Sequence, residues 1–449
     1  MKNFDLFEMR DEKTVLKNPH KGWYWHFIDC GYSRPRYRDD KELIGDFTAF
    51  PGLNQIYLRF DMVDINPRKG VYDFSYLDEI MDEYGKLGFT FSLRMCAYQT
   101  NVRRWGNNQL ATPDYVREEG AKGFYYDIVD PFDPTKRYDG KAWEPDYSDE
   151  IFLRYAEEAM MRLGEKYDGD PRIELVDIGT FGKYGEGHTE SKIYDEAVIK
   201  RHIDIARNAF PKTLLYTNDA MLKHNSESTQ ALIDYCLSLG IGIRDDSICV
   251  TWHALNGPSY DTVHSMRFVK PFFDKVPVNI EFAHNELVRE DVWKDGYTAM
   301  ESLKNTKATY AGFHDYPGRF LKRNPYFAEY CANRLGYWFR PDALELDENG
   351  GSITVTNLGW APSYRDYEMR LHLVKEDGEE LTPIRIAGSA GWKEQRTVRD
   401  EFSFEESIPC GKYTVKISLS DADGTPILMA LDSKLYEDGK YTVGEIEIK

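Results

Sequence analysis

Short apolar runs alternate with amphipathic segments over residues 20–340 of the chain. The runs are rich in β-branched and aromatic residues, and the segments after them carry apolar residues at helical spacing. Strands are predicted at residues 22–28, 55–62, 89–96, 173–179, 213–218, 246–252, 276–282 and 308–314. Strand and helix alternating in this way over about 320 residues are typical of a (β/α)8 TIM barrel, an α/β fold.

The pattern changes after residue 340. Residues 341–449 contain short alternating runs, such as "GSITVTN" and "KYTVKISL", separated by turns such as "DENGG" and "DADG". A period of two with closely spaced turns predicts an antiparallel β-sandwich. We therefore expect a barrel over residues 1–340 and a C-terminal β-sandwich over residues 341–449. The sandwich is expected to be structural, and carbohydrate binding is the alternative.

A long connection, residues 99–148, follows the third predicted strand. Connections of that length are usually functional or disordered. Its many Trp, Tyr and Phe residues argue against disorder. We expect it to form a wall or lid of a site.

The predicted strands place charged side chains inside the barrel. Along residues 55–62 the alternate positions Ile56, Leu58, Phe60 and Met62 are apolar, so this face must contact the helices. The same alternation points five charged residues inward: Arg59, Asp61, Arg94, Asp177 and Glu281. Buried unpaired charges are costly, so these residues should form a paired network. Active sites of this fold lie at the carboxyl ends of the strands, where these charges concentrate; the alternative is a network that only satisfies itself.

Two glutamates lie where an active site is expected. Glu281 ends the seventh predicted strand in "VNIEFAHNE", and Glu186 follows the fourth in "DIGTFGKYGEGH". Glycosidic cleavage commonly uses such a pair, one carboxylic acid to protonate the leaving oxygen and one carboxylate to attack or to activate water. Glycines around Glu186 allow the backbone to approach a ligand closely.

Several stretches resemble known proteins. "IYLRFDMVDINPRKGVYDFSYLDEIMDEYGKLGFTFSLRM" resembles the second and third strands of the large clan of retaining (β/α)8 glycoside hydrolases. "NPHKGW", "DIGTFGKYGEGH" and the C-terminal β-domain resemble an uncharacterised family of glycosidase-like barrel proteins. The resemblance implies that Glu186 is the acid/base, that Glu281 is the nucleophile, and that Arg59 hydrogen-bonds the nucleophile.

The sequence departs from that clan in two respects, and one of them is that Glu186 lies some eight residues past the predicted strand. Gly185 stands where the clan usually has Asn before the acid/base, and "IGTFGKYGE" looks somewhat like the strand 4 loop of β-amylases, whose glutamate is the general acid of an inverting reaction. Retention is favoured and inversion stays open. In either case Glu186 is the expected proton donor.

Histidines occur at several predicted strand ends: His188, His253, His284 and His314. With Glu186, Glu281 and Asp315 they offer a metal-dependent alternative. Their spacing matches no compact metal motif, so no metal ligand and no cofactor is assigned. We expect these histidines to bind sugar hydroxyls, and Trp23, Trp252 and Tyr316 to stack on sugar rings. The alternative for each is a buried structural position.

Composition narrows the class of partner. The net charge of −19 and pI near 5.1, with no segregated basic patch, argue against nucleic acid. The charged N-terminus and the absence of a long apolar run argue against an export signal and a membrane span, so a cytoplasmic location is expected, with a trimmed secreted protein as the alternative. Aromatic residues make up 14% of the chain, which suits either a large core or a sugar-binding groove.

Three hypotheses follow. The first is a glycoside hydrolase that acts on an oligo- or polysaccharide through Glu186 and Glu281. The second is a metal-dependent barrel enzyme acting on a sugar or small polyol. The third is a carbohydrate-binding protein without catalysis. The oligomeric state, the sugar and the linkage are left open.

Overall fold

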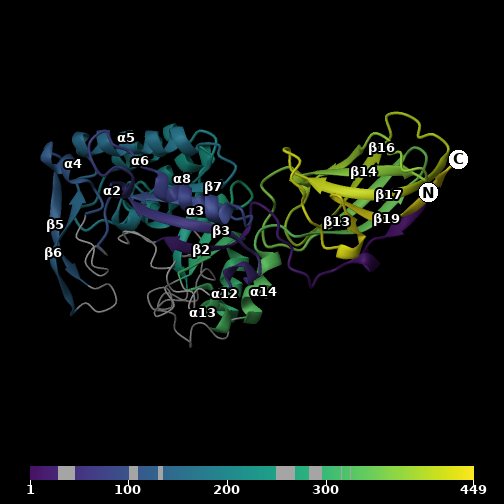
Figure 1. The fold of residues 1–449 in the computed structure, drawn as a ribbon, viewed down its shortest axis with the longest axis horizontal. Coiled ribbons are helices and arrows are strands. Elements are labelled where there is room, and N and C mark those ends of the chain that lie inside the picture. Colours follow the sequence, from purple (N-terminus) through teal and green to yellow (C-terminus); the bar gives the residue numbers. More distant parts are fainter. Residues whose placement is uncertain are drawn as a thin grey trace.

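The computed structural model describes residues 1–28, 46–100, 110–129, 135–248, 268–282, 296–314, 316–323 and 325–449. Eight parallel strands close into a barrel in the order β10-β11-β2-β3-β4-β7-β8-β9, which confirms the predicted fold (Figure 1). They are β2 (Gly22–Ile28), β3 (Leu53–Asp61), β4 (Thr90–Cys96), β7 (Ile173–Asp177), β8 (Leu214–Asn218), β9 (Gly242–Ile248), β10 (Val278–Phe282) and β11 (Ala308–Phe313).

One predicted strand is displaced. The sixth was expected at residues 246–252, whereas β9 spans Gly242–Ile248. The run Arg244-Asp245-Asp246 looks like a solvent-exposed loop in the sequence, but Arg244 and Asp245 are buried. Charged residues inside a strand are stable here because partners across the barrel pair with them, and this information is absent from a local pattern.

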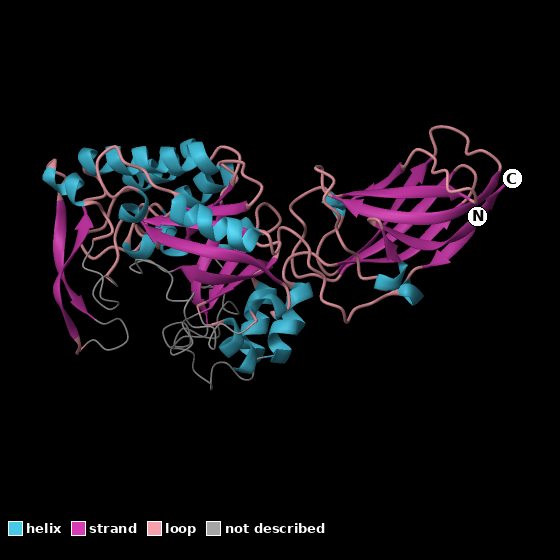
Figure 2. Ribbon diagram, viewed as in Figure 1, coloured by secondary structure: helices cyan, strands magenta, loops and turns pink. Residues whose placement is uncertain are grey.

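Helices pack outside the strands (Figure 2). They are α2 (Met62–Ile65), α3 (Ser75–Gly85), α4 (Asp114–Glu118), α5 (Glu150–Tyr167), α6 (Glu196–Ala209), α7 (Asp219–Lys223), α8 (Thr229–Ser238), α12 (Tyr297–Asn305), α13 (Pro317–Arg323) and α14 (Pro325–Arg334). Helix α5 shows why they form. Asp149 caps it by accepting from the N–H groups of Ile151 and Phe152, and residues at helical spacing, such as Phe152, Ala156 and Leu163, are buried in the barrel core.

The barrel interior contains rings where aliphatic side chains are usual. A buried cluster consists of Tyr24, Tyr57, Leu175, Tyr216 and Tyr310. Tyr57, Leu175 and Tyr310 belong to three different strands, so this layer fills the cross-section of the barrel. A charged layer lies beyond it, toward the carboxyl ends of the strands.

The long connection after β4 contains a β-hairpin. Strands β5 (Gly123–Val129) and β6 (Arg137–Pro145) pair antiparallel and stand at the end of the barrel away from the C-terminal domain (Figure 1). Glu144 and Trp143 of β6 are buried, so the hairpin is anchored to the barrel. Its role as a wall or lid stays a prediction.

The C-terminal domain has two antiparallel sheets, of orders β1-β12-β13-β16 and β15-β14-β17-β19-β18, around a single apolar core, as predicted. The strands are β1 (Lys2–Asp5), β12 (Phe339–Leu346), β13 (Gly350–Asn357), β14 (Glu368–Lys375), β15 (Ile384–Gly388), β16 (Arg396–Ser403), β17 (Gly411–Ser420), β18 (Tyr436–Glu437) and β19 (Lys440–Ile448).

The N-terminal strand corrects the expected domain boundary. Strand β1 pairs with β12, and Phe4 and Leu6 are buried in the core of the sandwich. The first residues therefore belong to the sandwich and not to a barrel domain beginning at residue 1. Both chain ends lie at the far end of the sandwich (Figure 1). A pairing between residues more than 330 positions apart leaves no local signal.

The two domains meet at the amino end of the barrel. His20, just before β2, has its Nδ1 2.7 Å from Oε1 of Glu174 in β7 and its Nε2 3.3 Å from Oδ2 of Asp421 in the sandwich. Lys21 is buried beside it and donates to the carbonyls of Asn333 and Tyr337. Within the described part of the chain, no helix combines the length and hydropathy needed to cross a bilayer.

Candidate active site

Strand register places three charged residues at one level of the barrel wall. Arg59 of β3 stands opposite Arg94 of β4, and Arg94 stands opposite Asp177 of β7. All three are buried. Two neighbouring guanidinium groups repel each other in a buried setting, so this layer is stable only if carboxylates neutralise it.

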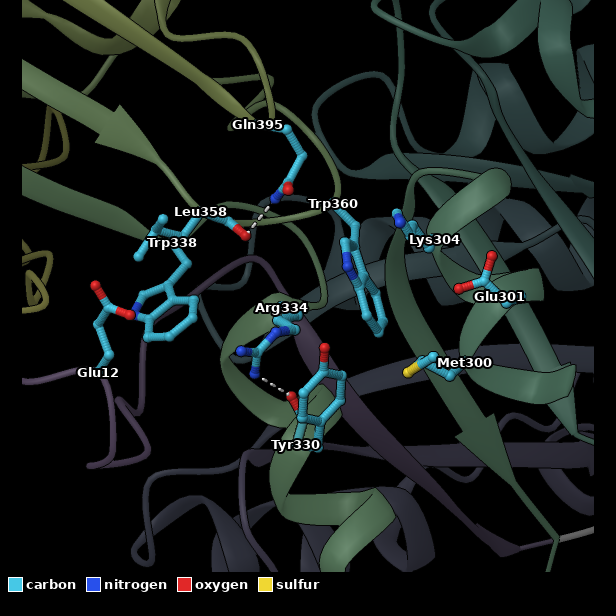
Figure 3. A pocket seen from close by; sticks show the side chains of 10 residues that line it. All are labelled: Glu12, Met300, Glu301, Lys304, Tyr330, Arg334, Trp338, Leu358, Trp360 and Gln395. Carbon is cyan, nitrogen blue, oxygen red and sulfur yellow. Dashed lines mark hydrogen bonds between the residues drawn. The ribbon is translucent and has the colours of Figure 1, made fainter. Parts of the chain in front are cut away.

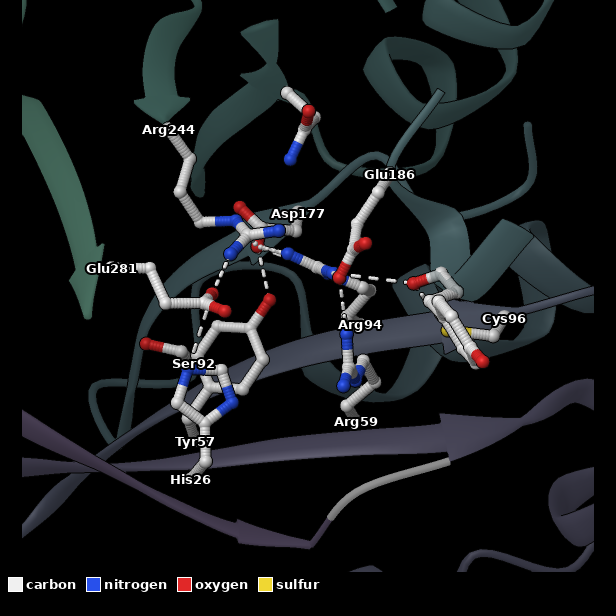
Figure 4. A network of polar contacts seen from close by, with 12 residues as sticks. His26, Tyr57, Arg59, Ser92, Arg94, Cys96, Asp177, Glu186, Arg244 and Glu281 are labelled. Carbon is white, nitrogen blue, oxygen red and sulfur yellow. Dashed lines mark hydrogen bonds and ion pairs between the residues drawn. The ribbon is translucent and has the colours of Figure 1, made fainter. Parts of the chain in front are cut away.

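Asp177 provides one of those carboxylates. Its Oδ2 accepts from Nη2 of Arg94 at 2.9 Å and from the hydroxyl of Tyr57, and Nε of Arg244 in β9 lies 2.9 Å away (Figure 4). Burial raises the pKa of the Tyr57 phenol well above its ordinary value, so the phenol keeps its proton and donates. Asp177 thus joins Arg94 to Arg244.

Glu281, at the end of β10, is the second carboxylate. Its Oε2 accepts from Nη1 of Arg244, and Nε2 of His26 lies 3.3 Å from the same oxygen. Its Oε1 contacts Nε2 of His314. The rings of His26 and His314 stack with centroids 3.8 Å apart. Glu281 is therefore surrounded by one guanidinium and two imidazoles.

Glu186, in the loop after β7, is the third carboxylate. Its Oε1 accepts from Nη1 of Arg59 and lies 3.3 Å from Nη1 of Arg94. Its side chain is 15% exposed, against 4% for Asp177 and 3% for Glu281. Glu186 is thus the most accessible carboxylate of the three.

These contacts form one continuous chain of alternating charge. It runs in the order Glu281, Arg244, Asp177, Arg94, Glu186 and Arg59. Three carboxylates balance three guanidinium groups, so the layer carries no net charge from these residues. Four of the five charged residues predicted to face inward belong to it: Arg59, Arg94, Asp177 and Glu281.

The glycines of the loop have a steric role. Gly187 has φ of +88°, and a Cβ there would lie 2.2 Å from the backbone nitrogen of Met221. Gly185 has φ of +70°, and a Cβ there would lie 2.7 Å from Cα of Gly179. An asparagine at position 185 would have to adopt the same positive φ, and its Cβ would clash with Cα of Gly179. This explains why Gly185 stands where the clan has Asn. The tight loop brings Glu186 back over the charged layer.

Tyr184 adopts a strained backbone in the same loop. Its φ is +57°, which is unfavourable for a side chain of this size. Its carbonyl accepts from Nη1 of Arg94 at 3.2 Å, and its hydroxyl pairs with that of Thr100 at 2.7 Å. Its ring lies 5.6 Å from the guanidinium of Arg59. The strained residue thus lies next to Glu186. Its carbonyl and ring contact Arg94 and Arg59, the two arginines that bind the Glu186 carboxylate.

Two expectations for site residues are corrected. Arg59 contacts Glu186, and the arginine that donates to Glu281 is Arg244. Trp23 is fully buried on the helix side of the barrel, where its ring packs against Phe282 and Phe327 and its Nε1 donates to Ala328. It has no free face for a sugar. Odd and even positions of β2 point to opposite sides, and Trp23 lies on the outer one.

The other predicted residues are dispersed. Asp61 is buried at the N-terminus of α2 and accepts from Nε2 of Gln99 at 2.8 Å. His188 is exposed in the loop after Glu186, with its ring 6.4 Å from that of Tyr184. Tyr316 is partly buried against the core, under the guanidinium of Arg319. Four candidate residues lie outside the described residues: Trp252, His253, His284 and Asp315.

Sequence reasoning missed Arg244, which belongs to the ion-pair chain, and it missed Tyr57 and His26, which contact carboxylates of that chain. Tyr57 alternates with Arg59, and His26 lies on the inner face of β2 opposite Trp23 and Trp25, so strict period-two counting would have found both. Arg244 was not identified because the predicted strand began at residue 246, whereas β9 begins at Gly242.

One cluster has the composition of a metal site. One ligand atom each from His26, Glu281 and His314 lie within 4.8 Å of one another. Two imidazoles and a carboxylate suit a divalent transition metal. Arg244, which donates to the same carboxylate, places a positive charge against such an ion.

Comparisons with known proteins gave structural matches. No protein-family model matches the chain, and no curated protein matches it. Similar solved structures include a psychrophilic glycoside hydrolase family 10 endo-beta-1,4-xylanase (12% identity, TM-score 0.40, covering 66% of this chain and 86% of that chain). They also include xylanase XynB from Paenibacillus barcinonensis (15%, 0.40, 68% and 88%) and xylanase B from Clostridium stercorarium F9 (13%, 0.38, 66% and 86%).

Proposed function

We propose that the protein is a glycoside hydrolase that uses Glu186 and Glu281 as its catalytic pair. The observation that supports this is the ion-pair chain, which ties a carboxylate from the loop after β7 to one at the end of β10 on the same end of the barrel. Two carboxyl groups that flank a bond are what glycosidic cleavage requires. A network that served stability alone would not need a strained loop to bring a partly exposed glutamate to it.

Glu281 is the proposed nucleophile. Arg244 neutralises it inside the barrel, so it can stay ionised while almost completely buried. His314 and His26 hold its two oxygens and fix the direction of attack. Positioning of this kind lowers the barrier because little reorganisation is needed during the reaction.

Glu186 is the proposed proton donor. Two arginines stabilise its ionised form in the present arrangement. It can therefore act as an acid only when the substrate displaces at least one of them. Replacing Arg59 with Met should then make Glu186 easier to protonate, and the alkaline limb of the kcat/KM profile should move to higher pH.

The experiment compares two leaving groups. Glu281→Gln should lower turnover of both a 2,4-dinitrophenyl glycoside and an unactivated oligosaccharide by orders of magnitude. Glu186→Gln should lose about 10²–10⁴-fold on the oligosaccharide and far less in the glycosylation step with the dinitrophenyl substrate, since that leaving group needs no proton. Glu190→Gln is the matched control, because Glu190 lies in the same loop but bonds Tyr98 and Lys183.

Two outcomes would contradict the proposal. Full activity in Glu281→Gln would remove the nucleophile, and saccharide binding without turnover on any substrate would indicate a binding protein. Retention is the proposed stereochemistry. Proton NMR of the first product anomer checks it, and azide should restore turnover of the dinitrophenyl glycoside by Glu186→Ala only if the reaction is retaining.

A metal-dependent enzyme acting on a sugar or small polyol is the second candidate, favoured by the proximity of His26, Glu281 and His314. A divalent ion there would polarise a substrate oxygen or activate water. This candidate predicts stoichiometric metal by elemental analysis, and loss of both metal and activity in His26→Ala. The glycosidase proposal predicts undiminished activity after exhaustive chelation.

A further inference from the structure

A pocket of about 300 Å³ lies where the barrel and the sandwich meet, apart from the ion-pair chain (Figure 3). Helices α12 and α14 form one side of it, with Met300, Lys304 and Tyr330 among its lining. The sandwich contributes the other side through Trp338, before β12, and Trp360, after β13. None of these residues takes part in the proposed catalysis.

Aromatic rings lead from the surface into this pocket. Tyr326 and Tyr330 are four residues apart on α14, with ring centroids 6.2 Å apart, and Trp360 follows at 6.5 Å from Tyr330. Tyr326 is 77% exposed, whereas Trp360 is buried at the inner end of the row. Steps of this size are comparable with one pyranose unit, and aromatic faces suit the apolar faces of sugars.

Polar groups of both kinds surround the rings. The guanidinium of Arg334 lies 3.8 Å from the Tyr330 ring centroid and donates to the Tyr330 carbonyl at 2.8 Å. Lys304 adds a second cation, and Glu301 and Glu12 add two carboxylates, so the lining has no net charge. Nε1 of Trp338, which is 2% exposed, has no hydrogen-bond partner within the described residues. Donors and acceptors without a dominant charge fit a neutral polyhydroxyl ligand better than an ion.

The sandwich side of the pocket is rigidly built. The N–H of Trp360 donates to the Arg334 carbonyl at 2.8 Å, and the N–H of Leu358 donates to the Trp338 carbonyl at 2.7 Å. A Cβ on Gly359 would lie 2.1 Å from the carbonyl oxygen of Gly336, so the loop is in close contact with the chain beneath it. A preformed wall reduces the entropy that binding must overcome.

We propose that this pocket, extended by Tyr326, is a second binding site for a neutral oligosaccharide. The site would hold a polysaccharide on the enzyme, and this would raise the local concentration of the polysaccharide at the barrel. The inferred binding depends on the junction alone, whereas its use in supplying the barrel with substrate rests on the proposed function.

The test uses the full chain carrying Glu186→Gln and Glu281→Gln, so that no probe is consumed. Cellohexaose, xylohexaose and mannohexaose are titrated by calorimetry, and saturation-transfer NMR shows which sugar protons contact the protein. At least one probe should bind with a component that Tyr326→Ala/Tyr330→Ala weakens about tenfold or more. Tyr330→Phe, which keeps the ring, should preserve that component.

Tyr297→Ala is the matched control, because Tyr297 is 60% exposed on the neighbouring α12 but does not line the pocket. Lys304→Ala removes a polar group without opening the core, and it should also weaken binding. Binding that is identical in the tyrosine variants and their parent, or no binding of any probe, would overturn the inference. Failure of the proposed hydrolase is a separate result, since it is measured as turnover by the unsubstituted chain.

Discussion

Replacing Asp177 with Asn tests the ion-pair chain most directly. The two side chains have nearly the same shape, so the change removes charge and little volume. Asp177 is buried and serves Arg94, Arg244 and Tyr57 at once. Without its charge, two buried guanidinium groups share the remaining carboxylates, Glu186 and Glu281.

The expected cost is large. Removing one partner of a buried ion pair typically lowers the free energy of unfolding by about 3–5 kcal/mol. Since about 1.4 kcal/mol corresponds to a factor of ten, amide hydrogens of β4 and β7 that exchange through opening of the barrel should lose about 100-fold to about 4,000-fold of their protection. Hydrogen exchange, measured by mass spectrometry on peptides from these strands, reports the loss of protection in the barrel alone. A global unfolding experiment would mix the barrel with the sandwich.

A surface ion pair provides the control. Glu165 and Arg162 of α5 form a pair at 2.8 Å with both side chains more than half exposed. Glu165→Gln should cost at most about 1 kcal/mol and leave exchange in β4 and β7 almost unchanged. If Asp177→Asn changed exchange no more than Glu165→Gln does, the chain would not be a stabilising network and the reasoning above would be wrong.

Two further predictions concern the loops around the site. Burial raises the pKa of Glu144 from 4.5 to about 7, so the folded state binds its proton more tightly than the unfolded chain, and unfolding free energy is lost as pH rises between these values. Glu144→Gln should therefore gain unfolding free energy relative to the parent as the pH rises from 4.5 to 8 in urea unfolding, and a pH-independent difference would contradict this. Gly187→Ala should distort the Glu186 loop and remove most activity, because its Cβ would meet the backbone of Met221, whereas Gly70→Ala, with φ of +70° and open space around it, should cost only about 1 kcal/mol in unfolding and keep kcat. Equal effects of the two glycine substitutions, measured as kcat and melting temperature, would show that backbone conformation and not steric contact governs the loop.

The fold could be predicted because its signals are local. Apolar alternation on β3 and β4, and helical spacing on segments such as α5, appear within a few residues of sequence. The same rule failed for β9, where Arg244 and Asp245 are buried by partners across the barrel. It also failed for β1, whose partner β12 lies at the other end of the chain.

The candidate site could be predicted only in part. Strand parity identified Arg59, Arg94, Asp177 and Glu281 as inward residues, because a side chain on a barrel strand has only two directions. Parity does not say which charge meets which. The resemblance implies that Arg59 contacts Glu281, but Arg59 contacts Glu186 and Arg244 contacts Glu281. Glu186 reaches Arg59 through a loop whose path depends on contacts with Met221 and Gly179.

The amino-acid sequence alone was enough to predict an eight-stranded barrel with an inward layer of charge, a β-sandwich after it, and two glutamates near the carboxyl ends of barrel strands. These properties follow from periodicity and composition, which each segment carries alone. The folded chain was needed to show the order of the ion-pair chain, the burial of Trp23, the pairing of β1 and the pocket at the domain junction. Each of these features depends on contacts between residues that are distant in the sequence. Such contacts form because apolar surfaces pack and buried charges pair, and neither can be read from one segment alone.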